Sequence, residues 1–382
     1  MIFSSLTFLL FFLPITLLLY YLMPGIRLKN AALLLCSLIF YAWGEPVYIL
    51  LMLYSILMNY VCGLLMDKHK KMRRQILVFG IIVNLFLLGF FKYAGFLSGN
   101  FNHLFGRLGV AVPVRNIALP IGISFYTFQA LSYSIDVYRG KITERCSLPD
   151  FMLFVAFFPT VLSGPIEKAR NLLPQLRAYN PLSVSAFTEG AVTFIWGLFK
   201  KIVIADRLCA YVDWAYAGAE HQSGATLALA AVFYSIQIYC DFSGYSDMAW
   251  GVAKALGFDV TRNFRFPYFA TTIKEFWRRW HISLTSWFTE YVYFSLGGNR
   301  VRLKARWVFN ISMVFILSGI WHGASWNFLL WGALHAVYYL IEYACGLHLK
   351  GYETPRLLKL PATLLVFVLV TIAWIFFRIE DF

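Results

Sequence analysis

The chain has 382 residues, of which 60% are hydrophobic, 19% aromatic and only 14% charged. A soluble domain carries about 25% charged residues, so this chain has too little polar material to cover a water-facing surface, which excludes an ordinary soluble enzyme, a disordered chain and a disulfide scaffold. The net charge of +14 lies in short basic runs between apolar stretches, a pattern typical of membrane topology and not of a nucleic-acid-binding surface. We therefore predict a multi-pass membrane protein that binds lipid and no nucleic acid.

Apolar stretches of membrane-spanning length recur along the chain, since a helix needs about 20 apolar residues to cross about 30 Å of hydrocarbon. The runs are continuous and do not alternate, which favours helices over barrel strands. The basic loops at 24–30 and 67–74 orient the protein with these loops in the cytoplasm. We predict about eleven helices, three of them short, over residues 5–23, 31–44, 47–66, 75–94, 117–137, 151–163, 185–205, 225–241, 307–321, 326–346 and 359–377.

The region from 241 to 306 departs from this pattern, because it is rich in Trp, Arg, Phe and Gly but has no clean apolar run of spanning length. Irregular backbone at membrane depth is tolerated where it is buried in protein or lines a cavity. We expect re-entrant and interfacial helices around a pocket here. At its start, Asp241, Ser243 and Tyr245 follow an apolar run. We expect Asp241 or Ser243 to cap a new helix beginning near Tyr245, and both to be able to shape a polar cavity.

A second element of this region is the run from 274 to 288, which contains His281. If the run is one helix, Trp277, Trp280 and His281 share a face through their spacing. An interfacial helix with an aromatic belt and snorkelling arginines explains the tryptophans and arginines. It explains a histidine on the apolar face less well, so His281 is a candidate functional residue.

A third element places His322 at the end of an apolar span, among small residues that allow a substrate to approach its imidazole. Neutral imidazole is the usual general base near neutral pH, and an ionisable group at membrane depth is a functional candidate. The alternative is a histidine satisfied by a neighbouring helix carbonyl. The other residues expected at this site are Trp321, Gly323 and Asn327.

Signatures of other chemistries are absent from the sequence. The six cysteines are scattered without a C-x-x-C pair, and His322 and His335 have no carboxylate cluster near them in sequence, so we predict no disulfide and no metal site. The sequence also lacks G-x-S-x-G, H-E-x-x-H and P-loop patterns. Three kinds of function therefore remain open: group transfer catalysed by histidine, transport, and a scaffold for export.

Several blocks together resemble the membrane-bound O-acyltransferase (MBOAT) family, in particular its bacterial alginate O-acetyltransferase (AlgI-like) branch. Any one block is only suggestive, but their order on a multi-pass chain is specific. The block at 241–247 also looks like that of the D-alanyl transferase branch. The blocks are IFSSL (2–6), FYAWG (40–44), PIGISFYTFQ (120–129), FPTVLSGPI (158–166), DFSGYSD (241–247), WRRWH (277–281) and WHGASWN (321–327).

The resemblance implies that His322 is the catalytic histidine and His281 the second polar position of the family. It implies a single domain over 1–382, an all-α ring of tilted and re-entrant helices around a tunnel that crosses the membrane. The AlgI-like proteins usually continue well past the segment at 373–378, so we expect the C-terminus to be shortened relative to them. Residues expected to bind substrate are Asp241, Ser243, Tyr245, Trp321, Gly323 and Asn327.

The function implied by the resemblance is O-acetyl transfer in the bacterial cytoplasmic (inner) membrane, with acetyl-CoA as the donor substrate and no bound cofactor. The acceptor is expected to be a hydroxyl of an exported polysaccharide or of a periplasmic acetyltransferase partner. Two alternatives remain open: D-alanyl-type transfer to a cell-wall polymer, and a polymer or acyl transporter without transferase chemistry.

Overall fold

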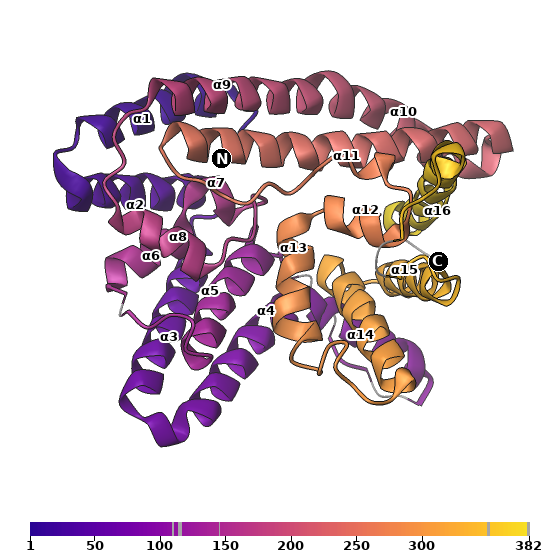
Figure 1. Cartoon of the computed structure of the whole chain (residues 1–382), viewed down its shortest axis with the longest axis horizontal. Coiled ribbons are helices and arrows are strands. Elements are labelled where there is room, and N and C mark those ends of the chain that lie inside the picture. Colours follow the sequence, from indigo (N-terminus) through magenta and orange to yellow (C-terminus); the bar gives the residue numbers. More distant parts are fainter. Residues whose placement is uncertain (109–110, 114–116, 145, 350–351, 380–382) are drawn as a thin grey trace. The chain divides into compact units, whose positions relative to one another are not determined.

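The computed structural model describes residues 1–108, 111–113, 117–144, 146–349 and 352–379. Throughout this part of the chain the regular structure is helical and contains no strand, so the all-α prediction is confirmed (Figure 1). The residues form two compact units, Met1–Trp196 with Asp247–Thr261, and Gly197–Ser246 with Arg262–Phe382. Each unit is described by itself, and the expectation of a single domain stays a prediction.

The first unit contains nine labelled α-helices and the end of a tenth, α11, which continues into it from the second unit. Its helices pack mainly through aromatic and small residues; for example, the rings of Phe8, Phe40 and Phe158 lie within 6.4 Å of one another. The bounds are α1 (Leu13–Leu22), α2 (Gly25–Gly44), α3 (Ile49–Lys68), α4 (Arg73–Phe105), α5 (Ile123–Tyr138), α6 (Leu148–Ala156), α7 (Phe158–Val161), α8 (Ala169–Arg177) and α9 (Val184–Phe199).

The second unit carries the region that the sequence singled out. Short helices lie between 241 and 306, beside a hairpin of longer helices. That they are re-entrant or interfacial stays a prediction. The bounds are the π-helix η4 (Lys200–Ala205), α10 (Asp206–Ala217), α11 (Gly224–Ala255), α12 (Ile273–Arg279), α13 (Ile282–Trp287), the π-helix η7 (Phe288–Tyr293), α14 (Lys304–His322), α15 (Trp326–Ala344) and α16 (Lys359–Arg378).

Each of the eleven predicted segments coincides with helix, but the lengths differ. Helix α4 continues to Phe105, beyond the predicted end at 94; in its last turns Ser98 Oγ donates to Ala94 O at 2.8 Å and Asn100 Nδ2 to Phe96 O at 2.8 Å, so these polar side chains are satisfied within the helix. Among the residues that the structure describes, five helices are long and apolar enough to cross a membrane. They lie within Gly25–Gly44, Ile49–Lys68, Lys70–Leu108, Gly224–Ala255 and Arg356–Arg378.

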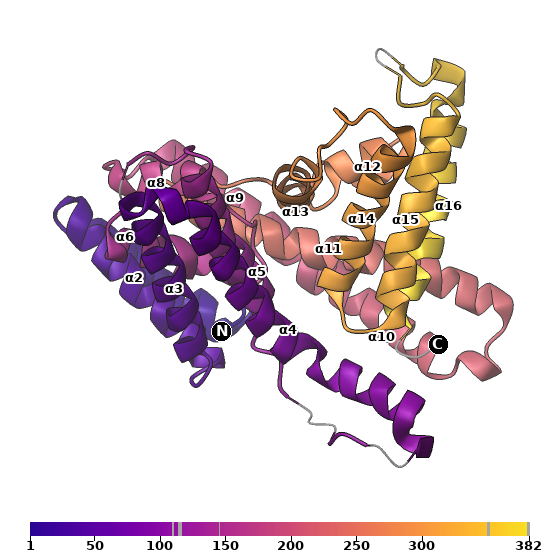
Figure 2. The ribbon, with the colours of Figure 1, turned by 90° about the horizontal axis from the view of Figure 1, so that it is seen from below.

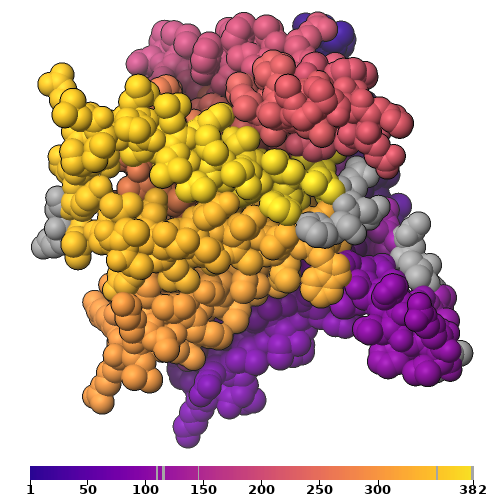
Figure 3. All heavy atoms as spheres, turned by 90° about the vertical axis from the view of Figure 1, so that its right-hand side faces the viewer, coloured from indigo at the N-terminus to yellow at the C-terminus, as the bar shows by residue number. Residues whose placement is uncertain are grey.

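Helices α14, α15 and α16 lie side by side in sequence order (Figure 2). Two glycines bring α14 and α15 into backbone contact: a Cβ on Gly332 would lie 2.5 Å from the carbonyl oxygen of Phe315, and a Cβ on Gly319 would overlap the carbonyl oxygen of Phe328. Small residues at such crossings are typical of helices in membranes. Figure 3 shows the outer face of these helices as adjoining bands, where Leu364 and Val368 of α16 are exposed, as expected for a lipid-facing surface.

Candidate active site

His322 is the last residue of α14, so its imidazole stands where the helix ends and the backbone turns toward α15. Aromatic rings surround it. The His322 ring lies 4.9 Å from Trp321, 5.1 Å from Trp331 of α15 and 5.1 Å from Phe377 of α16, measured between ring centroids. The side chain is half-buried, so rings from α14, α15 and α16 fix the imidazole while part of it remains accessible.

His281 lies at the break between α12 and α13, with a left-handed backbone (φ 43°) that a residue with a side chain rarely adopts. The possible single helix over 274–288 is therefore not formed. Asn263 holds the two residues that follow His281: its carbonyl oxygen accepts a hydrogen bond from Ile282 N at 2.9 Å, and its Oδ1 accepts one from Ser283 N at 3.2 Å. Tertiary contacts of this kind are what sustain a strained conformation, which costs about 1–3 kcal/mol.

Trp321 brings the two histidines into one cluster. Its ring centroid is 6.0 Å from that of His281 and 4.9 Å from that of His322. The His281 ring also packs against the Phe242 ring in a T-shaped arrangement, with 4.6 Å between the ring centroids. His281 is only 1% exposed. The predicted residues His281, Trp321 and His322 therefore lie together in the second unit.

The predicted break near Tyr245 is wrong, because α11 runs without interruption from Gly224 to Ala255. Neither Asp241 nor Ser243 caps a helix there. Asp241 instead forms an ion pair with Lys201 (Nζ–Oδ1 2.6 Å), and Ser243 Oγ accepts a hydrogen bond from Lys200 Nζ at 2.9 Å.

These contacts join α11 to η4, which carries both lysines. Between the polar residues, Gly244 allows the two helices to touch, since a Cβ there would lie 2.7 Å from the carbonyl oxygen of Gly197. Tyr245 follows on α11 and is half-buried. The polar block thus anchors one helix to another, while Phe242 contacts His281. Substrate contacts of Asp241, Ser243 and Tyr245 stay predictions.

The remaining two predicted residues have packing roles. A Cβ on Gly323 would overlap the ring of Phe328, which in turn packs at 4.9 Å on the Phe377 ring beside His322. Asn327 is buried, and its Nδ2 donates to the carbonyl oxygen of Ile379 at 2.7 Å. Gly323 and Asn327 therefore shape the surroundings of His322 by fixing α15 and the end of α16, and substrate binding by either stays a prediction.

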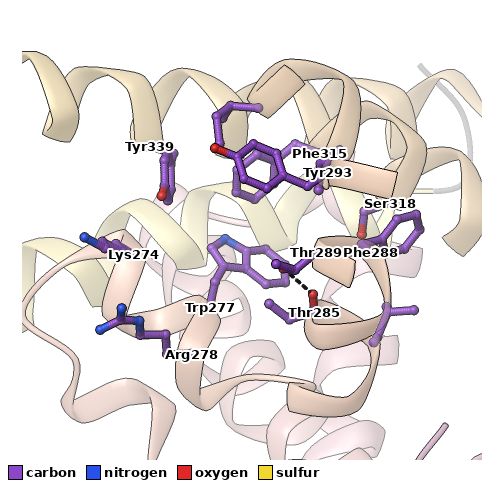
Figure 4. Close-up of a pocket in the computed structure, with 13 residues that line it drawn as sticks. Lys274, Trp277, Arg278, Thr285, Phe288, Thr289, Tyr293, Phe315, Ser318 and Tyr339 are labelled. Carbon is purple, nitrogen blue, oxygen red and sulfur yellow. Dashed lines mark hydrogen bonds between the residues drawn. The ribbon is translucent and has the colours of Figure 1, made fainter. Parts of the chain in front are cut away.

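A pocket of about 240 Å³ lies between α12, α13, η7, α14 and α15 (Figure 4). Lys274 and Arg278 lie at one end of it, aromatic rings including Trp277 and Phe315 form its walls, and Ser318 lies at the other end. Ser318 is one helical turn before His322 on α14. Thr285, also in the lining, donates its backbone N–H to His281 O at 3.0 Å. The pocket therefore extends from two cations to within one turn of each histidine.

Sequence reasoning missed several residues of this site. Trp331 is fully buried against His322, and His335, on the same helix, contacts Trp277 at 4.9 Å. Phe377 reaches His322 from α16. Trp331 and Phe377 lie within long apolar runs, where nothing in the local pattern separates a residue beside the site from ordinary core. His335 is an ionisable group in such a run, and that signal could have found it.

The second unit thus holds two histidines in contact with one tryptophan, near a pocket with two cations in its lining. The sequence profile of the MBOAT, membrane-bound O-acyltransferase family, matches residues 35–379. The chain belongs to this family and is a multi-pass membrane O-acyltransferase.

Three relatives illustrate the range of the family. The chain is 41% identical to the protein named "Probable alginate O-acetylase AlgI" of Pseudomonas aeruginosa, over 100% of this chain and 72% of that protein. It is 34% identical to the "Peptidoglycan O-acetyltransferase" of Helicobacter pylori, over 100% of this chain and 77% of the relative. It is 28% identical to the "Teichoic acid D-alanyltransferase" of Bacillus subtilis, over 59% of each chain.

Proposed function

We propose that this enzyme is an O-acetyltransferase of the bacterial inner membrane, which moves an acetyl group from cytoplasmic acetyl-CoA to a hydroxyl on the other side. The acceptor is an exported polysaccharide or a periplasmic acetyltransferase partner. Similarity along the whole of this chain to two proteins whose names describe acetyl transfer supports acetyl as the acyl group. The helices would form a ring around a tunnel through which donor and acceptor meet.

The observation that carries this proposal is the contact of Trp321 with both His281 and His322, with a pocket ending one turn from both. Transfer of an acetyl group from a thioester to a hydroxyl needs a base for the hydroxyl proton and a donor for the carbonyl oxygen. Two imidazoles that share one aromatic neighbour supply both kinds of group, because each ring has two nitrogens with separable donor and acceptor roles.

In the proposed reaction, His322 removes the proton from the acceptor hydroxyl as its oxygen attacks the thioester carbonyl carbon. The carbonyl oxygen becomes negative, and an N–H of His281 donates to it. Collapse of this tetrahedral intermediate breaks the carbon–sulfur bond, and the CoA thiolate leaves with the proton from His322. Positioned acid–base catalysis contributes about 10²–10⁴-fold, and one oxyanion donor about 10²–10³-fold.

The pocket of Figure 4 fits the donor's thioester arm, because its walls are aromatic and its lining includes Ser318 and Thr285, each one helical turn from a histidine. Its two cations also line a more polar cleft of about 810 Å³, together with Arg279 and Lys359. Cations favour phosphate groups, so the phosphate-bearing end of CoA would lie in the cleft and its arm in the pocket.

The proposal is tested with purified protein, polysaccharide from the host strain and either acetyl-CoA or a D-alanyl-loaded carrier protein. We expect CoA release and acetylated polysaccharide with the first donor and no transfer from the second. Transfer from the D-alanyl carrier alone would favour the D-alanyl branch. Movement of donor into sealed vesicles without release of CoA would favour a transporter.

Charge removal at the pocket gives a sharper prediction. Replacing Lys274 or Arg278 by alanine should raise KM for acetyl-CoA about tenfold with little change in kcat, because one charged hydrogen bond contributes about 1.5 kcal/mol. The effect should shrink at high salt. Arg356→Ala removes an exposed charge outside the pocket lining and should leave KM unchanged. An unchanged KM in both pocket variants would show that Lys274 and Arg278 do not contribute to donor binding.

A further inference from the structure

Glu342 of α15 is a partly buried carboxylate at the opposite end of α12 from His281. Its side chain is 12% exposed, and a charge in such a place needs polar partners. Oε1 accepts a hydrogen bond from the backbone N–H of Ile273 at 2.5 Å, and Oε2 accepts from the N–H of Lys274 at 3.2 Å. These are the first two residues of α12, so Glu342 caps the start of that helix from a neighbouring one.

His348 completes the arrangement. Its Nε2 lies 3.2 Å from Glu342 Oε2, its side chain is 5% exposed, and its carbonyl oxygen accepts from Lys274 Nζ at 3.4 Å. The ring packs against Tyr339 of α15 at 4.5 Å. His348 thus holds the Glu342 carboxylate in the orientation that receives both backbone N–H groups.

The cap from Glu342 stabilises α12, which is too short to be stable by itself. Helix α12 has seven residues, and helices shorter than about 12 residues are marginal without tertiary packing. The third backbone N–H of its first turn, that of Glu275, has no acceptor within the helix and donates to Thr272 Oγ1 at 3.0 Å. Further along α12, Trp277 packs on His335 of α15 at 4.9 Å. Helix α12 is therefore held against α15 at its start and in its middle, and it ends in the turn that contains His281.

We propose that Glu342 and His348 are positioning residues for the transfer reaction: they dock α12 on α15 and so set where His281 meets Trp321 and where Lys274 lines the pocket. The proposal rests on the proposed function of His281. Helix α12 carries a pocket cation at its second residue and leads into His281, so a shift of its start displaces both. Misplacement by about 1 Å is enough to cost about 10²-fold in rate.

The test compares Glu342→Ala, Glu342→Gln, His348→Leu and His348→Gln in the full-length protein, with acetyl-CoA as donor and host polysaccharide as acceptor. Glu342→Ala should lower kcat at least about tenfold and also raise KM, whereas Lys274→Ala changes KM alone. His348→Gln keeps an N–H donor and should retain more activity than His348→Leu. Glu220→Gln is the matched control, since Glu220 is an exposed carboxylate outside the linings of the pocket and the cleft, and it should behave like the wild type.

A second readout does not depend on the donor. Amide hydrogen exchange of the 273–281 segment should become faster in Glu342→Ala and remain unchanged in Glu220→Gln. Unchanged exchange, or a folded Glu342→Ala protein with wild-type kcat and only a lower Tm, would overturn the positioning role. If the wild type releases no CoA from acetyl-CoA, the proposed donor fails, and the exchange result still decides the role of Glu342 in holding α12.

Discussion

His322→Ala is expected to lower acetyl transfer from acetyl-CoA by about 10²- to 10⁴-fold, the contribution typical of a positioned general base. The loss should fall on kcat, because the imidazole acts on the acceptor proton in the transition state and lies one turn beyond the donor pocket. Rings from three helices hold the site, so the shortened side chain should leave the surrounding packing largely in place.

The measurement is the rate of CoA release with host polysaccharide as acceptor, together with the acetyl content of surface polysaccharide in a strain that carries the variant. His221→Ala is the matched control, since His221 is exposed and lies in a short turn of the same unit. A folded His322→Ala protein that transfers acetyl at the wild-type rate would contradict the assignment of His322 as general base.

Local sequence patterns predicted the helices and singled out two histidines that the structure places against one tryptophan; the catalytic roles of these histidines stay predictions. Long apolar runs need helices at membrane depth, so every predicted segment coincides with helix. His281 and His322 stood out because each is an ionisable group within an aromatic or small-residue block. Trp321 adjoins His322 in sequence, so its place beside that ring follows directly; its contact with His281 does not.

The wrong expectations all concern residues whose partners lie far away in the chain. Asp241 and Ser243 looked like helix caps because short polar side chains compete with backbone bonds. In the structure Asp241 pairs with Lys201 and Ser243 accepts a hydrogen bond from Lys200, about forty positions earlier in the chain. Helix α11 therefore continues past both residues. The left-handed turn at His281 likewise depends on Asn263. No periodicity within one segment reveals such pairings.

The same reasoning explains why the residues that position the site were not predicted. Glu342 is an isolated carboxylate near the end of an apolar helix, and only the folded arrangement places the N-terminus of α12 against it. Trp331 and Phe377 belong to the site because α15 and α16 pack on α14. The sequence motif thus reveals a candidate reactive residue such as His322, whereas the residues that hold it in place come from neighbouring helices and are found only in the structure.

Gly319→Leu is expected to have the second large effect, because it acts on that packing. Gly319 lies one turn before His322, where α14 touches the backbone of α15, and even a Cβ would overlap the carbonyl oxygen of Phe328. Overpacking costs about 1–3 kcal/mol, and more where a backbone must move. The helices should separate, carrying His322 away from Trp331.

We expect Gly319→Leu to lower Tm and to reduce kcat of the remaining folded protein strongly, with Gly319→Ala intermediate in both. Gly99→Leu is the control, since a Cβ on that exposed glycine of α4 meets nothing within 4 Å. Thermal unfolding in detergent and CoA release on the same preparations separate the two effects. If Gly319→Leu lowered Tm but kept the wild-type kcat, the close approach of α14 and α15 would serve stability alone, and His322 would not depend on it for its position.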